Sequence, residues 1–437
     1  MMLVTQPATS PLKGELVPPG DKSISHRALI FACLADGQSR VTGLLESADV
    51  QATARACRQL GMGIRKEGDD LVLDGAGTTG LSRPVAPLDM GNSGTAMRLL
   101  TGVLAAQPFD TELFGDDSLN RRPMTRIVKP LSLMGARIET AQAGTPPLKI
   151  SGNPDLQGID YASPIASAQV KSCVLLAGLY ARGHTTVSEP LKSRDHTEKM
   201  LPAFGVGLYG PCGVRGGSRL QGTSIHVPAD ISSAAFFMVA AAMIPGSDLL
   251  LGNVGLNQTR DGIIHVLEAM GADITIHDRR RQGGEDVGDI RVRYSGRLNA
   301  VEIPVDLIPS LIDELPVILA LAAVSDGTTV LRGAAELRVK ESDRLAVMAR
   351  GLETLGVALQ EYPDGIDIQG GAIRGGRVDG AGDHRCAMSF AVLGQVAGAE
   401  VQVTGAENID TSFPSFVQDL SRAGGRVKVM PGESSDV

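Results

Sequence analysis

A helix tail that ends in glycine recurs six times along this chain, and this repeat constrains the fold more than any other feature. Each copy has apolar residues at helical spacing, then a glycine, then a strand-like run. The glycines are Gly61, Gly135, Gly205, Gly271, Gly356 and Gly424, and subtraction gives separations of 74, 70, 66, 85 and 68 residues. Glycine readily adopts the left-handed conformation that ends a helix and turns the chain into a strand. The repeat therefore predicts six α/β units.

The six units divide most simply into two domains of three units each. A chain of 437 residues exceeds the usual size of a single compact core. We place the boundary near residues 228–230 (Pro-Ala-Asp), between the third and fourth units. Two nearly all-apolar segments, 162–180 and 231–244, predict interior helices with sheets packed around them. The polar residues 279–288 predict an exposed hairpin loop with solvated arginines, and the tail from Pro431 is expected to be disordered.

Composition and charge argue against several classes of function. The net charge of −8 and the scarcity of aromatic residues disfavour nucleic-acid binding. The longest apolar run, residues 234–244, is too short to span a bilayer, so no membrane association is expected. Five scattered cysteines without a C-x-x-C pair indicate reduced thiols in a cytoplasmic protein. The seven histidines show no metal-binding spacing, and we expect neither a metal nor a cofactor.

Residues 19–27 (Pro-Gly-Asp-Lys-Ser-Ile-Ser-His-Arg) combine three devices for holding an anion. Ser23 and Ser25 are N-cap candidates for the apolar helix that follows, and a helix start presents unpaired N–H groups to phosphate or carboxylate. Lys22 and Arg27 add positive charge on either side of that start. The segment fails the pattern G-x-x-x-x-G-K-[ST], because an extra residue separates the glycine from the lysine. A surface turn with scattered charges is the alternative interpretation.

Basic and hydroxyl residues also collect at other predicted helix starts. Singly, each start is more simply a solvated cap or a surface ion pair. Their recurrence in both halves favours a cleft between domains that holds a polyanionic substrate. The segments are residues 89–98, 120–124, 167–171, 193–196, 338–344 and 383–385.

Asp313 and Glu341 are the best acid–base candidates among the carboxylates. With Lys22 they would form a mixed set near cations, where pKa values are usually displaced. Lys340, Glu341 and Arg344 are expected within one helical turn of each other. Asp313 could instead merely cap the next helix, and Glu341 could merely pair with Arg344.

Taken in order along the chain, these motifs resemble the 5-enolpyruvylshikimate-3-phosphate synthases. The resemblance runs from about residue 12 to residue 416. Ser167-Ala-Gln-Val-Lys171 and Asn257-Gln-Thr-Arg260 are similar to the second class of these enzymes. The segments that carry it are residues 19–27, Gly91-Asn-Ser-Gly-Thr-Ala-Met-Arg98, Arg122-Pro123, Ser167-Ala-Gln169, Arg338-Val-Lys-Glu-Ser-Asp-Arg344 and Asp383-His-Arg385.

The resemblance implies a fold and a reaction. The fold is a two-domain inside-out α/β (α+β) barrel with six βαβαββ repeats, three in each domain. The N-terminal strand would cross over, so that the domains are residues 20–229 and residues 1–19 plus 230–437. Shikimate-3-phosphate and phosphoenolpyruvate would condense through a tetrahedral ketal, which then loses phosphate. Domain closure on the first substrate would complete the second site. A monomer that binds only these small molecules is expected.

The resemblance also implies roles for individual residues. Asp313 would take the proton from the attacking 5-hydroxyl, and Glu341 would protonate the methylene of phosphoenolpyruvate, with Lys22 assisting. Shikimate-3-phosphate would be held by Lys22, Ser23, Arg27, Ser167, Ala168, Gln169, Arg194, Asp313 and Lys340. Phosphoenolpyruvate would be held by Lys22, Asn92, Gly94, Arg122, Gln169, Arg344 and Arg385.

Two positions bear on sensitivity to glyphosate, a herbicide directed at enzymes of this family, and they point in opposite directions. Thr411 stands where many members have lysine, so one contact to phosphoenolpyruvate or the herbicide is expected to be missing. Gly94 is the small residue typical of sensitive members. The response to glyphosate therefore stays open.

Two other functions are weighed against this one. The sister enolpyruvyl transferase that acts on UDP-N-acetylglucosamine usually carries a reactive cysteine in a mobile loop, and the corresponding residues 109–129 contain none. A non-enzymatic ring of repeats such as a DNA sliding clamp would need basic inner helices. The predicted interior helices are instead rich in alanine, leucine and methionine.

Overall fold

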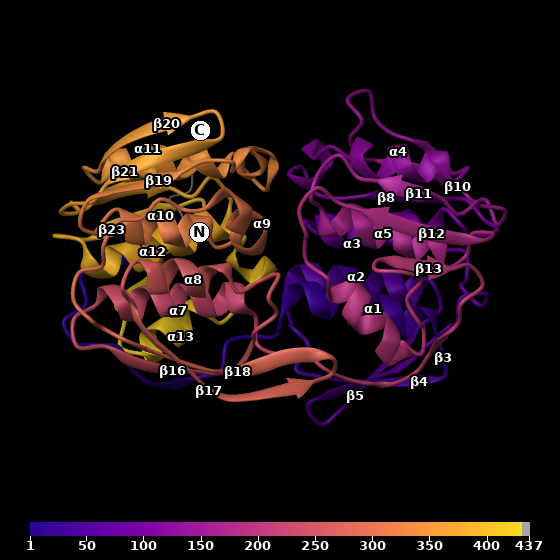
Figure 1. Ribbon diagram of the computed structural model, residues 1–437, viewed down its shortest axis with the longest axis horizontal. Coiled ribbons are helices and arrows are strands. Elements are labelled where there is room, and N and C mark those ends of the chain that lie inside the picture. Colours follow the sequence, from indigo (N-terminus) through magenta and orange to yellow (C-terminus); the bar gives the residue numbers. More distant parts are fainter. Residues whose placement is uncertain (431–437) are drawn as a thin grey trace. The chain divides into compact units, whose positions relative to one another are not determined.

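The computed structural model describes residues 1–430, which form two compact units (Figure 1). The N-terminal unit consists of Gly20–Val227 and Gln282–Glu285. The C-terminal unit consists of Met1–Pro19, Pro228–Arg281 and the residues from Asp286 onward. The chain passes from the N-terminal to the C-terminal unit between residues 227 and 228. The boundary expected from the sequence lies two residues later, between 229 and 230. The expectation for the tail from Pro431 lies outside the described residues.

Within residues 20–227, the N-terminal unit combines short sheets with helices. Its helices are α1 (Lys22–Leu34), α2 (Ala48–Gln59), α3 (Gly94–Leu104), α4 (Thr125–Leu133), α5 (Ala168–Gly178) and α6 (His196–Met200). Its sheets, in strand order, are β15 (Ser224–His226), β4 (Gln38–Thr42), β6 (Asp70–Asp74) and β5 (Gly63–Glu67); β7 (Leu88–Asp89), β8 (Thr111–Phe114), β10 (Leu148–Ser151) and β9 (Arg137–Glu139); β11 (Asp160–Ala162), β12 (His184–Ser188) and β13 (Gly213–Arg215); and β14 (Leu220–Gln221) with β3 (Ala35–Asp36).

The C-terminal unit is built in the same way. Its helices are α7 (Ile231–Met243), α8 (Gly262–Ala269), α9 (Ile308–Leu311), α10 (Leu315–Ala322), α11 (Arg344–Thr354), α12 (His384–Leu393) and α13 (Phe416–Arg422). Its sheets, in strand order, are β22 (Gly376–Asp379), β23 (Val401–Thr404), β1 (Met2–Thr5) and β24 (Val427–Met430); β17 (Asp273–Gln282), β18 (Glu285–Arg293), β16 (Asp248–Gly255) and β2 (Lys13–Leu16); and β19 (Thr328–Leu331), β21 (Gly365–Gln369) and β20 (Ala358–Tyr362).

The sheets mix parallel and antiparallel pairs. The first two strands of the chain both join the C-terminal unit: β1 runs antiparallel to β23, with Leu3 opposite Val403, and β2 runs parallel to β16, with Leu16 opposite Leu251. Parallel pairs need crossover connections, and α3, α5 and α12 supply those of β7 with β8, β11 with β12, and β22 with β23. The predicted two-domain α/β fold is thus confirmed.

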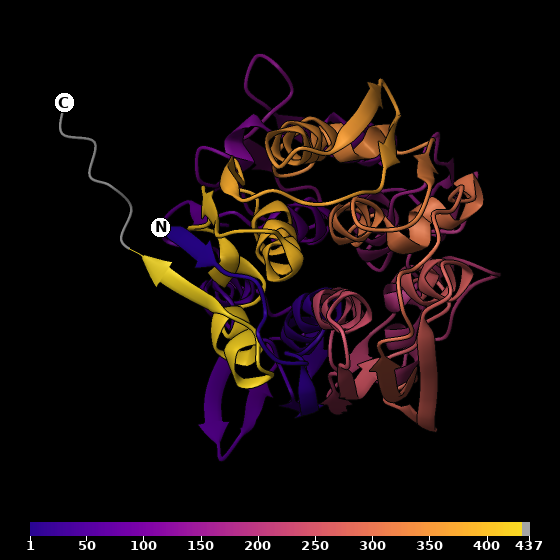
Figure 2. The same ribbon diagram turned by 90° about the vertical axis from the view of Figure 1, so that its left-hand side faces the viewer.

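Buried helices occupy the middle of each unit, as predicted from the apolar segments. Helix α7 is buried at every position and packs against α10 and α12; Figure 2 shows helices of this unit end-on, with strands around them. The segment 162–180 forms a shorter helix than expected, because α5 begins only at Ala168. In the N-terminal unit α5 packs along α3, and a Cβ on Gly102 would lie 2.2 Å from the carbonyl oxygen of Cys173. Glycine at this position permits the close contact of α3 with α5.

The six repeat glycines behave as the sequence predicts. Each follows the end of a helix, and all have positive φ angles, from 81° at Gly205 to 110° at Gly424. This is the left-handed conformation in which a side chain would be strained. The repeated helix-to-strand turn is therefore confirmed at five copies, whereas after Gly205 the next strand, β13, begins only at Gly213.

Residues 279–288 form a hairpin, as predicted, but they are not a loop. The strands β17 and β18 run through them and are joined at Gly283 and Gly284. These two glycines have φ angles of 60° and 89°, and two consecutive left-handed residues make the tight turn of a two-residue hairpin. The arginines 279–281 are exposed, as predicted.

Three features bear on the class of protein. No helix within residues 1–430 is long and apolar enough to cross a bilayer. The five cysteines are free thiols. In the same described residues, no group of three or more His, Cys, Asp or Glu side chains is arranged to hold a metal ion.

Candidate active site

The first group of predicted site residues lies at the start of α1 in the N-terminal unit. The helix begins at Lys22, and Asp21 is its N-cap, because the Asp21 carboxylate accepts a backbone N–H of the first turn at 2.8 Å. The prediction that Ser23 or Ser25 caps this helix is wrong. Both lie inside the helix, and the Ser25 hydroxyl accepts the backbone N–H of Leu45 instead.

Lys22 and Arg27 differ in what they can offer a ligand. The Lys22 ammonium is partly exposed and lies 2.6 Å from the Asp49 carboxylate. Arg27 is buried, and its guanidinium donates to the hydroxyls of Thr197 and Ser172. Burial lowers the pKa of Arg27 to about 10, so the group stays charged at neutral pH. Lys22 thus reaches solvent, whereas Arg27 ties α1 to α5 and α6.

His26 connects the start of α1 with the loop before α3. Its Nδ1 lies 2.7 Å from the Thr53 hydroxyl, and its Nε2 lies 3.5 Å from the Ser93 hydroxyl. Burial, followed by the charges of Lys22 and Arg27, lowers the pKa of His26 well below its ordinary value. The ring is therefore neutral at pH 7 and acts as a fixed polar link between two of the predicted site segments.

Asn92, Gly94 and Arg122 come together at the start of α3. The Arg122 guanidinium donates to the Asn92 side-chain oxygen at 2.6 Å. Ser93 is the N-cap of α3. A Cβ on Gly94 would lie 2.9 Å from Nη1 of Arg98 and 3.4 Å from Nη1 of Arg122. Two guanidinium groups therefore flank the helix start, an arrangement that favours phosphate or carboxylate.

Ser167, Ala168 and Gln169 open α5 beside the start of α3. Ser167 is the N-cap, and Ala168 is the first helical residue. The Gln169 amide donates to the Thr95 hydroxyl at 2.9 Å, and its oxygen accepts from Arg98 at 2.5 Å. The close packing of α3 on α5 therefore brings two of the predicted segments into direct contact.

Arg194 and Lys171 belong to neighbouring parts of the same unit. Arg194 is half-buried on the loop that precedes α6. Lys171, which the sequence places among polar groups at the start of α5, is only 3% exposed. Its ammonium pairs with Glu189 at 3.0 Å and with Glu198 at 2.8 Å. Lys171 is thus directed into the protein.

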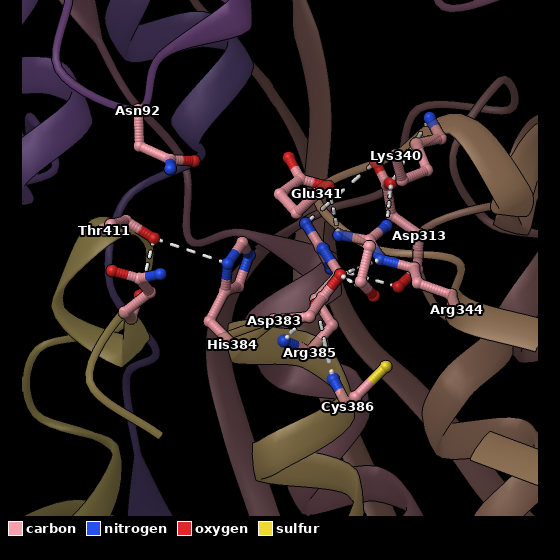
Figure 3. Close-up of polar contacts among 12 residues, drawn as sticks. Asn92, Asp313, Lys340, Glu341, Arg344, Asp383, His384, Arg385, Cys386 and Thr411 are labelled. Atoms are coloured by element: carbon pink, nitrogen blue, oxygen red, sulfur yellow. Dashed lines mark hydrogen bonds and ion pairs between the residues drawn. The ribbon is translucent and has the colours of Figure 1, made fainter. Parts of the chain in front are cut away.

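In the C-terminal unit, Arg344 is the centre of a buried charge cluster (Figure 3). Its side chain is 1% exposed and contacts Glu341 at 2.6 Å, Asp383 at 2.8 Å and Asp313 at 3.2 Å. Burial alone would lower the pKa of Arg344, but Asp383, Glu341 and Asp313 outweigh it and raise the pKa well above its ordinary value. The guanidinium is therefore permanently charged and holds three carboxylates around it.

Asp313 also faces two looser cations. The Lys340 ammonium lies 3.8 Å from the Asp313 carboxylate, and Nη2 of Arg385 lies 4.0 Å from it. Nη1 of Arg385 donates to the Asp313 backbone carbonyl at 3.1 Å. The structure thus brings all five predicted site residues of the C-terminal unit together.

The local structure decides between the alternatives that the sequence leaves open. Asp313 does not cap α10, because that helix follows Glu314 and has no side-chain cap. Glu341 does pair with Arg344. The expected helical turn for Lys340, Glu341 and Arg344 is wrong, because Asp343 caps α11 and the helix begins only at Arg344.

Two contacts of carboxylates were not predicted from the sequence: that of Asp383 with Arg344 and that of Asp49 with Lys22. Asp383 is the N-cap of α12, and it is fully buried beside Arg344. Asp49 lies on α2 and pairs with Lys22. Asp383 precedes His-Arg at a predicted helix start and was detectable as a cap, whereas the sequence around Asp49 has no comparable signal.

Thr411 contacts protein groups of the C-terminal unit. Its hydroxyl donates to the Asn408 carbonyl at 2.6 Å and lies 3.3 Å from Nδ1 of His384 (Figure 3). The side chain is buried. Position 411 therefore supplies a short, engaged hydroxyl and no positive charge.

Comparisons with known proteins agree with this arrangement. The family model described as EPSP synthase (3-phosphoshikimate 1-carboxyvinyltransferase) matches residues 7–420. A 3-phosphoshikimate 1-carboxyvinyltransferase of Xanthomonas campestris pv. campestris (strain B100) is 54% identical over 96% of this chain and 97% of its own. One of Xanthomonas euvesicatoria pv. vesicatoria (strain 85-10) is also 54% identical, over 93% of each chain. A solved EPSP synthase from Acinetobacter baumannii is 47% identical, with a TM-score of 0.87 over 98% of this chain and 100% of that one. The chain therefore belongs to the EPSP synthase family.

Proposed function

We propose that this chain, a 3-phosphoshikimate 1-carboxyvinyltransferase, performs its acid–base chemistry with Asp313 and Glu341, assisted by Lys22. The reaction transfers the enolpyruvyl group of phosphoenolpyruvate to the 5-hydroxyl of shikimate-3-phosphate and releases phosphate. One observation carries the assignment: the carboxylates of Asp313 and Glu341 contact the same guanidinium, that of the buried Arg344. The addition needs one base and one acid, and this pair supplies both.

Asp313 takes the proton of the 5-hydroxyl as its oxygen attacks C2 of phosphoenolpyruvate. Glu341, in its protonated form, gives a proton to the methylene carbon, and the product is a tetrahedral ketal. The ionised Glu341 then takes a proton from the new methyl group, and phosphate departs with the proton held by Asp313, which restores the double bond and both carboxyl groups. Arg344 contacts both carboxylates, so it stabilises whichever one is ionised at each stage.

Both substrates carry a phosphate and a carboxylate, and the proposed ligands suit such groups. Cations and helix starts provide the complementary charge without a metal ion or cofactor. The proposed ligands of shikimate-3-phosphate are Lys22, Ser23, Arg27, Ser167, Ala168, Gln169, Arg194, Asp313 and Lys340. Those of phosphoenolpyruvate are Lys22, Asn92, Gly94, Arg122, Gln169, Arg344 and Arg385.

The substrate is tested by measuring phosphate release from phosphoenolpyruvate with two acceptors. We expect release with shikimate-3-phosphate and none with UDP-N-acetylglucosamine. Release with the nucleotide sugar alone would overturn the proposed substrate and leave the fold unchanged.

The residue roles are tested with Asp313→Ala and Glu341→Ala. Each is expected to lose about 10²- to 10⁴-fold in kcat while still binding shikimate-3-phosphate, because a positioned acid or base contributes that much. Asp326→Ala is the control, because Asp326 forms only an exposed ion pair with Arg297. Near-normal turnover in either test variant would remove the role of that residue.

The assembly state and the compartment are also proposals. All the proposed ligands come from one chain, so a monomer is sufficient for the reaction. Light scattering should give a mass near 45.6 kDa. The free thiols are consistent with a cytoplasmic location, which cell fractionation can test.

A further inference from the structure

We propose that Glu189, held by Lys171, is a positioning residue for shikimate-3-phosphate. It acts through the two chain segments that carry Ser167 and Arg194. Both of these are ligands only under the proposed function, on which this role therefore rests. Neither Glu189 nor Lys171 is expected to touch the substrate.

The Glu189 carboxylate joins the start of α5 to the loop before α6. Glu189 directly follows β12, and its side chain is 6% exposed. One oxygen accepts the backbone N–H of Ser167 at 2.8 Å and the hydroxyl of Ser193 at 2.7 Å. The other oxygen accepts the backbone N–H of Ser193 at 3.3 Å. Arg194 directly follows Ser193, so a displacement of Glu189 would shift both the segment that carries Ser167 and the segment that carries Arg194.

Lys171 fixes this carboxylate from within the protein. Its ammonium lies 3.0 Å from Glu189, 2.8 Å from Glu198 on α6, and 3.4 Å from the Ser193 carbonyl. Burial alone would lower the pKa of Lys171, but Glu198 and Glu189 outweigh it and raise the pKa. The ammonium is therefore charged at neutral pH. Three elements, α5, α6 and the end of β12, meet at this one cation.

Stability alone is a weak explanation for such a cluster. A buried ion pair often stabilises a protein no more than apolar residues of the same volume would. The cluster instead supplies acceptors to N–H and O–H groups of two segments that carry proposed shikimate-3-phosphate ligands. Within the described residues its contacts do not involve Asn92, Gly94 or Arg122, the ligands of this unit that are proposed for phosphoenolpyruvate alone. Lys22 and Gln169 are proposed for both substrates, so loss of the cluster should weaken the binding of shikimate-3-phosphate more than that of phosphoenolpyruvate.

The test uses Glu189→Ala and Glu189→Gln in the full chain. The dissociation constant of shikimate-3-phosphate is measured by calorimetric titration without phosphoenolpyruvate. The KM of phosphoenolpyruvate is measured at saturating shikimate-3-phosphate, and Tm is recorded for each variant. Leu175→Ala is the matched control, because Leu175 is a fully buried core residue of the same helix, α5, and its apolar side chain takes part in none of the cluster's hydrogen bonds or ion pairs.

Glu189→Ala is expected to raise the dissociation constant of shikimate-3-phosphate about 10- to 100-fold, the effect of a small misplacement of binding groups. Glu189→Gln should raise it less, because its amide oxygen can still accept the Ser167 N–H. The KM of phosphoenolpyruvate should change less than the dissociation constant of shikimate-3-phosphate in both variants. Leu175→Ala should lower Tm and leave shikimate-3-phosphate binding unchanged.

Unchanged shikimate-3-phosphate binding in the folded variants would refute the role of Glu189, and so would an equal loss of binding in Leu175→Ala. If Glu189→Ala does not fold, the result for Glu189→Gln decides. A wild-type chain that releases no phosphate with shikimate-3-phosphate would refute the proposed function itself. That outcome is distinguishable because it appears before any variant is compared.

Discussion

Replacing Asp383 with asparagine tests the buried charge cluster around Arg344. Asp383 is fully buried, and one of its oxygens accepts from Nε of Arg344 at 2.8 Å. Its other oxygen accepts the backbone N–H of Arg385 at 2.9 Å and so caps α12. Asparagine keeps an acceptor for the cap but removes the charge that faces the guanidinium. The two roles of this carboxylate can therefore be separated.

The magnitude follows from these contacts. Removing one partner of a buried ion pair costs about 3–5 kcal/mol. Since Arg344 keeps Glu341 and Asp313, we expect the low end, about 3 kcal/mol, for Asp383→Asn. Asp383→Ala also loses the N-cap, which adds about 1 kcal/mol. At about 2–4 °C per kcal/mol for a unit of this size, Asp383→Asn should lower Tm by about 6–12 °C.

Scanning calorimetry of the two variants measures the decrease in Tm. The KM of phosphoenolpyruvate should also rise, because Arg344 loses its fixed orientation. Asp343→Asn is the control, because Asp343 caps α11 in the same way but pairs with Arg338 at a partly exposed site. The control should cost about 1 kcal/mol or less. A wild-type Tm for Asp383→Asn would refute the reasoning, and equal Tm values for its asparagine and alanine variants would refute the separate cap contribution.

Three further predictions follow from other parts of the structure. Burial lowers the pKa of His26, so below pH 6.5 the unfolded state binds a proton that the folded state does not. As the pH is lowered from 7 to 5, the free energy of unfolding should therefore decrease, by up to about 1.4 kcal/mol per pH unit more than in His26→Gln. Melting curves across this pH range measure the difference. Gly94→Ala should raise the KM of phosphoenolpyruvate several-fold without a large change in Tm, because its Cβ would meet the flexible end of Arg98; steady-state kinetics showing an unchanged KM would contradict this. Gly205→Ala should lower the free energy of unfolding, measured with urea, by about 1–2 kcal/mol, because φ is 81° at Gly205 and a side chain is strained there. The cost is conformational, since a Cβ would lie no closer than 3.6 Å to any atom. Gly207→Ala is the control and should leave the free energy of unfolding nearly unchanged, because a Cβ there has no atom within 4 Å.

Much of the fold and most of the residue grouping could be predicted from the sequence. The repeat glycines mark helix ends because a positive φ is a local requirement that few other residues meet. The nearly all-apolar segment 231–244 identified a helix that is buried on every face. The family motifs gave the site residues that the C-terminal unit brings together, Asp313 and Arg344 among them. Where prediction failed, neighbouring residues competed for the same local role: Asp21 capped α1 in place of Ser23 or Ser25.

By itself, the sequence determined the repeated α/β units, the buried helices and the family, because these depend on short-range patterns and on the identity of residues within motifs. Only the tertiary structure decided which charges face one another. Lys171 and Arg27 both stand at predicted helix starts, and both are buried against partners that are distant in the chain. Asp49 and Asp383 became partners of Lys22 and Arg344 through packing alone. A buried charge must be matched by an opposite charge or a hydrogen bond, and long-range packing determines which group provides it.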